Sequence, residues 1–265
     1  MVARIQCHTS LPGTGYPKSP CGNCESSGQS ATIEHSNRTE TVSKIQSIMN
    51  YFAHGMRFVD RPYFLAGTAL PDLLSVVDRR VRLRMKNVAP FVEETDSIQA
   101  ELASGIKQHL DDDHWFHSTQ GFLEITTDLS LLFRELFQND DSARVGFLGH
   151  ITTELLLDAV LIDQNPGLID RYYDAFLEID PFVTQQATNR MTTRETDQLR
   201  AWLVLFHKEA FLRDYPDPQR MHLRLNQVMK RVKLQPLPEG TISVLKTGRE
   251  IVEKRLDDLL PPEHF

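Results

Sequence analysis

The segment from residue 144 to residue 163, RVGFLGHITTELLLDAVLID, constrains the fold more than any other part of the chain. As a helix it would be apolar on almost every side, and a helix of that kind is buried. The same segment carries His150, Glu154 and Asp158 at spacing i, i+4, i+8. A buried carboxylate is costly unless it is paired, hydrogen-bonded or bound to a cation. The sequence therefore predicts a partner that neutralises Glu154 and Asp158.

A second helical segment, from 96 to 118, repeats this spacing with His109, Asp113 and His117. These side chains lie on the same side as an apolar stripe formed by Ile98, Leu102, Ile106 and Leu110. The outer members of such a triad stand roughly 80° and 12 Å apart, too far to share one ion comfortably. Two antiparallel helices that face each other could still supply several ligands to one or two ions. A two-metal centre is therefore geometrically plausible.

Imidazole and carboxylate ligands suit Mn²⁺, Fe²⁺ or Zn²⁺, and the absence of thiolates favours a hard divalent ion. The sequence has no GxSxG elbow, no P-loop and no GxGxxG, and its last cysteine is Cys24. Hydrolysis of a phosphodiester suits such a site, because a metal ion lowers the pKa of its water and stabilises charge on a phosphoryl oxygen. The competing interpretation is a wet acidic face at 111 to 113 with hydrogen-bonded core histidines.

The composition limits the class of protein. With 265 residues, 40% of them hydrophobic and 25% charged, the chain resembles a soluble globular protein. The formal net charge of −7 argues against general nucleic-acid binding. We find no run of 18 apolar residues and no signal-peptide core, so we expect no membrane span and a cytoplasmic location. The sequence does not indicate an oligomeric state.

Residues 1 to 46 are rich in Ser, Thr, Gly, Pro and Asn, which predicts a disordered extension. The cysteines Cys7, Cys21 and Cys24 lie there, and a zinc knuckle would need a fourth ligand from His8 or His35. Residues 47 to 265 show helical periodicity without a solenoid repeat, which predicts an all-α protein with a single compact helical bundle. Helices are expected near 73 to 86, 96 to 118, 121 to 138, 143 to 163, 167 to 178, 181 to 190, 194 to 213, 218 to 232 and 241 to 259.

Two further candidate ligands precede the triads, His54 in MNYFAHG and Asp72 at the end of AGTALPD. Proline disfavours helical geometry at the residue before it, and proline itself is common at the first position of a helix. We therefore expect a helix to begin at Pro71 with Asp72 in its first turn. A structural role there, in which the carboxylate complements the helix dipole, competes with metal binding.

Five positive charges gather in one stretch of this acidic chain, and we call them the basic patch: Arg79, Arg80, Arg82, Arg84 and Lys86. One interpretation is the solvated face of a helix. The other is a docking patch for an acidic partner, whose attraction would weaken with salt.

The order of MNYFAH, GTALPD, GIKQHLDDDHWFH and ELLLD resembles the acyl carrier protein phosphodiesterase family, from Met49 to about residue 210. The resemblance implies an HD-like helical fold and Mn²⁺-assisted hydrolysis that removes 4′-phosphopantetheine from holo-acyl carrier protein. Members of that family begin at the position of Met49. The residues before Met49 are therefore expected to be either a lineage-specific tail or the result of a translation start assigned too early.

The resemblance also implies site residues. The positions that match the family pattern are His54, Asp72, His109, Asp113 and Asp158. His117 and Glu154 stand where the family has Asp, and Ala159 stands where it has His. His150 has no family counterpart, and we interpret it as an outer ligand or a general acid/base that acts with Asp113.

Two alternatives remain open. AGTALPD followed by GFLGHITTE resembles elements of zinc-dependent phospholipase C-like proteins, which implies zinc and a small phosphodiester substrate. The other is a non-catalytic helical binding protein whose metal is structural or lost, as the exchanges at His117 and Ala159 suggest.

Overall fold

The structure is a computed structural model that describes residues 50–95, 97–138, 140 and 143–262. Every regular element in these ranges is a helix, and the one extended pairing there is an isolated antiparallel bridge between Leu83 and Thr192. The predicted all-α class is therefore confirmed. The described residues fall within one compact unit, Val42–Phe265. The extension predicted for residues 1 to 46, with its three cysteines, lies outside the described residues.

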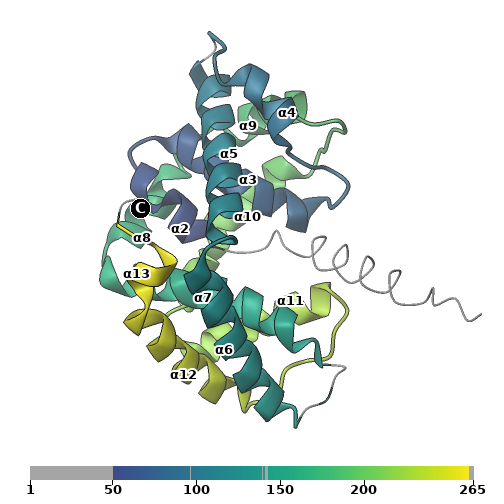
Figure 1. The fold of residues 1–265 in the computed structure, drawn as a ribbon. Coiled ribbons are helices and arrows are strands. Elements are labelled where there is room, and N and C mark those ends of the chain that lie inside the picture. The colour runs from purple at the N-terminus through teal and green to yellow at the C-terminus, as the bar shows by residue number, and fades with distance from the viewer. Residues whose placement is uncertain (1–49, 96, 139, 141–142, 263–265) are drawn as a thin grey trace, which may run out of the picture. The chain divides into compact units, whose positions relative to one another are not determined.

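Two helix pairs organise this unit, α3 with α5 and α6 with α7 (Figure 1). The α-helices are α2 (Tyr51–Gly55), α3 (Pro62–Val77), α4 (Met85–Val88), α5 (Ser97–Phe116), α6 (Gln120–Leu136), α7 (Val145–Gln164), α8 (Leu168–Ala175), α9 (Pro181–Arg190), α10 (Leu199–Glu209), α11 (Pro218–Arg231), α12 (Thr241–Lys254) and α13 (Leu256–Leu259). Short 3₁₀ helices are η1 (Met56–Phe58), η2 (Ala89–Phe91) and η4 (Phe211–Asp214). The short helix α2 contacts α3, α5 and α7, so it lies where the two pairs meet.

The buried helix predicted from residue 144 to 163 is α7. All its residues from Leu148 to Ile162 except His150 are buried, and it packs against α6, α12 and α2. By length and composition alone α7 could cross a membrane, and 78% of its apolar window is buried inside the structure. Packing on every side explains why its apolar residues show no single hydrophobic face.

The pair α3 and α5 crosses closely at two glycines. A Cβ on Gly67 would lie 2.5 Å from the backbone oxygen of Leu102, and one on Gly105 would overlap the backbone oxygen of Phe64. Only glycine therefore allows the two backbones this approach. Because Gly105 lies one turn before His109, the crossing sets the distance of that imidazole from α3.

The expected helix start at Pro71 is wrong. α3 begins at Pro62 and continues through Pro71 to Val77, which places Asp72 in its interior. An interior proline costs about 3 kcal/mol in an exposed helix. The apolar residues around it are almost completely buried, from Phe64 to Leu74, so tertiary packing outweighs that cost.

The expected helix near 73 to 86 is also wrong in its second half, because residues 78 to 84 are not helical. Val81 and Leu83 are buried there, and the basic side chains between and beside them are exposed. This alternation has the period of two that is typical of extended chain. The basic patch therefore lies on an extended segment and the start of α4, and not on one helix face.

The remaining predicted helices correspond to observed elements, with shifted ends. The segment predicted as 194 to 213 is helical only over α10 and η4, and the segment 241 to 259 is divided between α12 and α13. The sequence prediction missed α2, which is only five residues long. Short helices of this kind depend on tertiary contacts and not on periodicity.

Candidate metal centre

Helices α2, α5 and α7, with the turn that follows α5, bring six of the predicted ligands together in two groups. The first group is His54, His109 and Asp113, and the second is His117, His150 and Glu154. Within each group the ligand atoms all lie within 4.8 Å of one another. Each group thus offers two imidazoles and one carboxylate, a ligand set used for Zn²⁺ and Fe²⁺.

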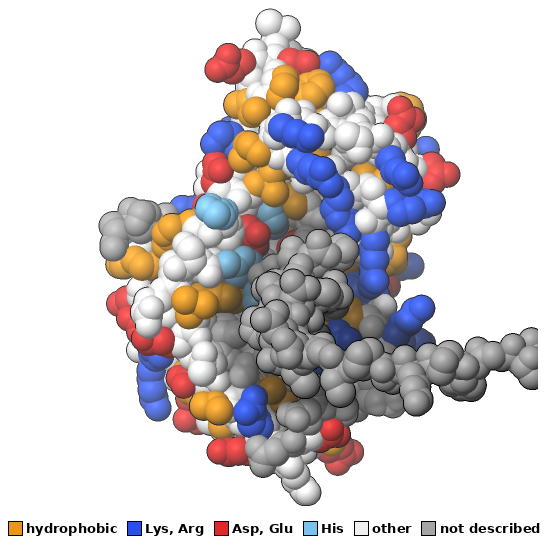
Figure 2. Space-filling view, turned by 45° about the vertical axis from the view of Figure 1, so that its right-hand side comes forward, with side chains coloured by type: hydrophobic (Ala, Val, Ile, Leu, Met, Phe, Trp, Pro, Cys, Tyr) orange, Lys and Arg blue, Asp and Glu red, His pale blue; other side chains and the backbone are white. Residues whose placement is uncertain are grey.

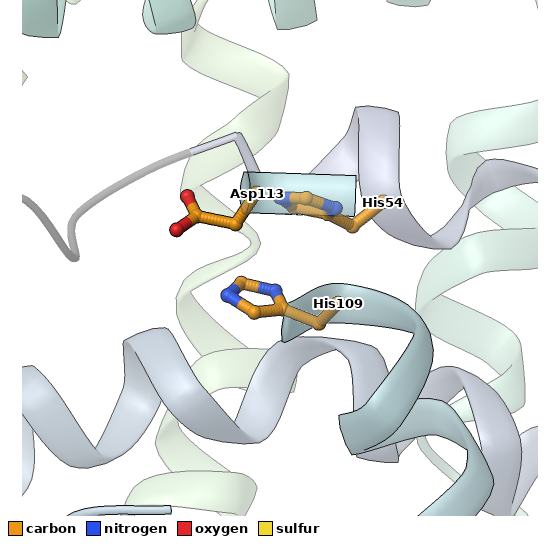
Figure 3. Close-up of side chains that lie close together, drawn as sticks. All are labelled: His54, His109 and Asp113. Carbon is orange, nitrogen blue, oxygen red and sulfur yellow. The ribbon is translucent and has the colours of Figure 1, made fainter. Parts of the chain in front are cut away.

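The two imidazoles of the first group are deeply buried. Their rings lie one above the other with Asp113 beside them, and the ring centroids of His54 and His109 are 4.2 Å apart (Figure 3). Nε2 of His54 and Nδ1 of His109 are buried without a hydrogen-bond partner among the described residues. Such nitrogens are costly to bury unless something binds them. These orphaned atoms fit a divalent ion.

The two rings differ in their surroundings. Burial, and then the neighbouring His54, lowers the pKa of His109 to about 3, and a hydrogen bond to the Thr68 backbone orients the ring. Burial also favours neutral His54, but Asp112 outweighs it and raises the pKa of His54 above its ordinary value. A histidine ligand whose second nitrogen is hydrogen-bonded to backbone is a common arrangement at metal sites. His109 therefore has the features of a preoriented ligand.

The second group converges on one buried carboxylate oxygen. Oε1 of Glu154 lies 2.8 Å from Nε2 of His117 and 3.1 Å from Nε2 of His150. The rings of His117 and His150 stack with centroids 4.8 Å apart, and the Phe122 ring contacts both in T-shaped arrangements. Burial raises the pKa of Glu154, but the two imidazoles outweigh it and hold this pKa at about 2.

Asp113 and His117 connect the two groups. Oδ1 of Asp113 lies 3.2 Å from Nδ1 of His117, whose other nitrogen hydrogen-bonds Glu154. Burial lowers the pKa of His117, but the carboxylates of Asp113 and Glu154 raise it to about 10. Burial likewise raises the pKa of Asp113, and the His117 imidazole brings it below its ordinary value. The side chain of Asp113 is 41% exposed, so the junction opens to solvent.

Two predicted ligands lie outside both groups. Asp158 is fully buried, and its carboxylate accepts hydrogen bonds from the backbone N–H groups of Phe52 and Ala53, at 3.0 and 2.8 Å. Burial raises the pKa of Asp158 to about 8 although these hydrogen bonds lower it. Asp72 is buried in α3 and acts electrostatically on Tyr51 and His54. Asp158 therefore holds α2, the helix that carries His54.

Asp112 is a neighbour of the site that the sequence prediction missed. Its Oδ2 lies 3.7 Å from Nδ1 of His54 and 3.6 Å from the Arg57 guanidinium. A cavity of about 20 Å³ opens beside it, lined by Asn50, Ala53, His54, Asp112, Trp115, Phe116 and Leu260. The acidic run at 111 to 113 indicated a wet face, and it did not show which of its carboxylates would face α2.

The basic patch is partly engaged in local contacts. Arg80 pairs with Asp78, Arg79 donates to the Arg231 carbonyl, and Arg82 donates to the Val81 carbonyl. Arg84 and Lys86 are exposed. Figure 2 shows a face on which Lys and Arg side chains gather above a surface that also carries histidine and acidic side chains. Lys and Arg side chains thus share a face of the described chain with histidine and acidic side chains.

Comparison with protein-family models, curated proteins and solved structures finds no match for the chain. The HD-like expectation therefore stays a prediction, as does the family resemblance. The residues themselves support a more general conclusion: the described chain has two groups of imidazoles and carboxylates that could hold metal ions.

Proposed function

We propose that the protein is a metal-dependent hydrolase of phosphodiesters. The observation that supports this proposal is the convergence of four imidazoles and two carboxylates from α2, α5 and α7 at a solvent-accessible junction, Asp113 and His117. A divalent ion held by His54, His109 and Asp113 would lower the pKa of a water molecule and offset charge on a phosphoryl oxygen.

The chain's own residues would orient this site and admit the substrate. Asp158 fixes the start of α2 and therefore the position of His54. The glycine crossing of α3 and α5 fixes His109. Asp113 is the most exposed member of either group, so a phosphodiester would approach from its side. Rigid elements that hold ligands in this way are typical of preorganised sites.

The finer proposal concerns the substrate and the metal. On the motif resemblance we propose Mn²⁺ as the ion and holo-acyl carrier protein as the substrate, with release of 4′-phosphopantetheine. The basic patch would attract such an acidic partner and raise its association rate. That attraction would weaken as the ionic strength rises.

The test is to incubate the purified, Mn²⁺-loaded protein with holo-acyl carrier protein and measure free phosphopantetheine. We expect release that is lost in Asp113→Ala and retained in His114→Ala, which removes an exposed histidine from the same helix. Arg84→Glu with Lys86→Glu should raise the KM for the carrier protein, and more so at low salt. No release by protein with confirmed bound metal would exclude this substrate.

A small phosphodiester is the second candidate substrate, and the exposure of Asp113 favours it because the junction needs no protein partner to be reached. Zinc in elemental analysis, with turnover of a generic nitrophenyl phosphodiester and none of the carrier protein, would support this candidate over the first.

A non-catalytic binding protein is a candidate from another class. The cavity beside His54 has a volume of about 20 Å³, which is room for about one water molecule. A metal there would be structural, and Asp113→Ala would then lower stability without any turnover to abolish. Turnover of either phosphodiester would exclude this candidate.

A further inference from the structure

We propose that His117, His150 and Glu154 form a second divalent-cation site, linked to the first through Asp113. This assigns His150 as a metal ligand and not as a general acid/base. The proposal concerns binding alone, so it stands whether or not the protein hydrolyses a phosphodiester.

The spacing of the donor atoms is the first argument. In a tetrahedral zinc site with bonds of about 2.1 Å, neighbouring donor atoms lie roughly 3.4 Å apart. Nε2 of His117 and Nε2 of His150 lie 2.8 and 3.1 Å from Oε1 of Glu154. Small side-chain movements would therefore admit an ion between them. The side chains of His117 and His150 are 15% and 16% exposed, so an ion can enter from solvent.

The arrangement around Glu154 is the second argument. Two imidazole nitrogens face one carboxylate oxygen, and His117 makes the shorter contact, a hydrogen bond. Nε2 of His150 is buried and lies 3.1 Å from the same oxygen, and this contact does not have the geometry of a regular hydrogen bond. One carboxylate oxygen thus serves two imidazoles. A cation shared by both nitrogens and the carboxylate would satisfy all three groups.

The link to the first site follows from the two nitrogens of His117. If Nε2 ligates the ion, Nδ1 carries the proton and donates to Oδ1 of Asp113, 3.2 Å away. A carboxylate that accepts from a ligating histidine fixes its tautomer and ring orientation. Asp113 would therefore be a ligand at the first site and a positioning residue at the second.

The ligand chemistry selects a borderline divalent ion at the second site. Two imidazoles with one carboxylate suit Zn²⁺, Co²⁺ or Fe²⁺ better than Mg²⁺ or Ca²⁺, which prefer oxygen ligands. Co²⁺ is a useful probe, because its visible absorption reports directly on coordination by the protein.

The experiment titrates the metal-free full chain, with Cys7, Cys21 and Cys24 replaced by serine so that thiols do not add to the count, with Zn²⁺ and Co²⁺. Calorimetry and absorption are the readouts. We expect two ions per chain for the wild type and for His114→Ala, the exposed-histidine control. His150→Ala should bind one, at the first site, and His54→Ala should bind one, at the second. Glu154→Gln provides a second test of the same site if His150→Ala folds poorly, and circular dichroism establishes the fold of each variant.

Asp113→Ala tests the link. It should abolish binding at the first site and raise the Kd at the second by about tenfold to a hundredfold, the usual effect of losing a carboxylate behind a ligating histidine. An unchanged second Kd would overturn the link. One ion per wild-type chain, or two in folded His150→Ala, would overturn the second site and leave His117 as a proton-bearing bridge between two carboxylates. Two bound ions without hydrolysis would instead count only against the proposed function.

Discussion

Asp158 shows how a buried carboxyl group can find hydrogen-bond partners inside this protein without a metal ion. The N–H groups of Phe52 and Ala53 point out of the first turn of α2, where a helix leaves its donors unsatisfied, and Asp158 accepts both. The sequence indicated that Asp158 would need a partner. It could not show that the partner is backbone, because the donors lie more than a hundred residues away in the chain.

We predict that Asp158→Ala lowers the free energy of unfolding by about 2 to 3 kcal/mol, because two buried N–H groups lose the carboxyl oxygens that accept their hydrogen bonds. Urea unfolding of the metal-free protein measures this. Asp174→Ala, an exposed carboxylate on α8, should change stability by less than about 0.5 kcal/mol. If the two variants unfold at the same urea concentration, Asp158 does not anchor α2.

The candidate ligands could be found from the sequence more readily than their grouping. Spacing i, i+4, i+8 identified His109, Asp113 and His117 as one triad, but the structure divides them between two groups. α5 ends at Phe116, and His117 turns toward Glu154 on α7. Periodicity shows which face of a helix is buried, but it does not show which other helix packs against that face. For the same reason Asp112 was not recognised as a neighbour of His54.

At the scale of elements, buried packing decided the cases in which local preference was misleading. α3 passes through Pro71 because its neighbours are buried, whereas the segment from 78 to 84 is a turn followed by extended chain although helix was predicted there. In the segment from 78 to 84 the sequence did carry a signal for extended chain, because Val81 and Leu83 alternate with exposed arginines. The prediction of a helix over 73 to 86 did not use this alternation.

The glycine crossing makes an element-scale prediction. Alanine normally stabilises a helix interior by about 1 kcal/mol relative to glycine. At Gly105 the added Cβ would overlap the Phe64 carbonyl on α3, and we expect a net loss of about 1 to 3 kcal/mol. Gly146→Ala in α7 is the matched control, because nothing lies within 4 Å of its Cβ. It should be neutral or stabilising in thermal unfolding. Equal effects of the two substitutions would contradict the close crossing.

Across the described chain as a whole, the all-α class followed from helical periodicity, and the pairing of the helices did not. Local sequence does not determine that α3 packs on α5 or that α6 packs on α7. Nor does it determine that α2 lies between the pairs. The six grouped ligands occur at this junction, on α2, α5, α7 and the turn that follows α5. An ion bound at either group would therefore couple the two helix pairs and raise the free energy of unfolding.

We predict that the melting temperature rises with divalent metal and falls with chelator. An ion present at 100 times its Kd stabilises the folded state by about 2.7 kcal/mol per site. For a domain of this size that corresponds to roughly 5 to 11 °C.

Thermal scans with Zn²⁺ or Mn²⁺ against EDTA measure the shift. The double variant His54→Ala, His150→Ala should lose this shift in melting temperature, because it removes one imidazole from each group. His114→Ala should keep the full shift, and a wild-type melting temperature that does not respond to any of these ions would show that the two groups do not bind metal.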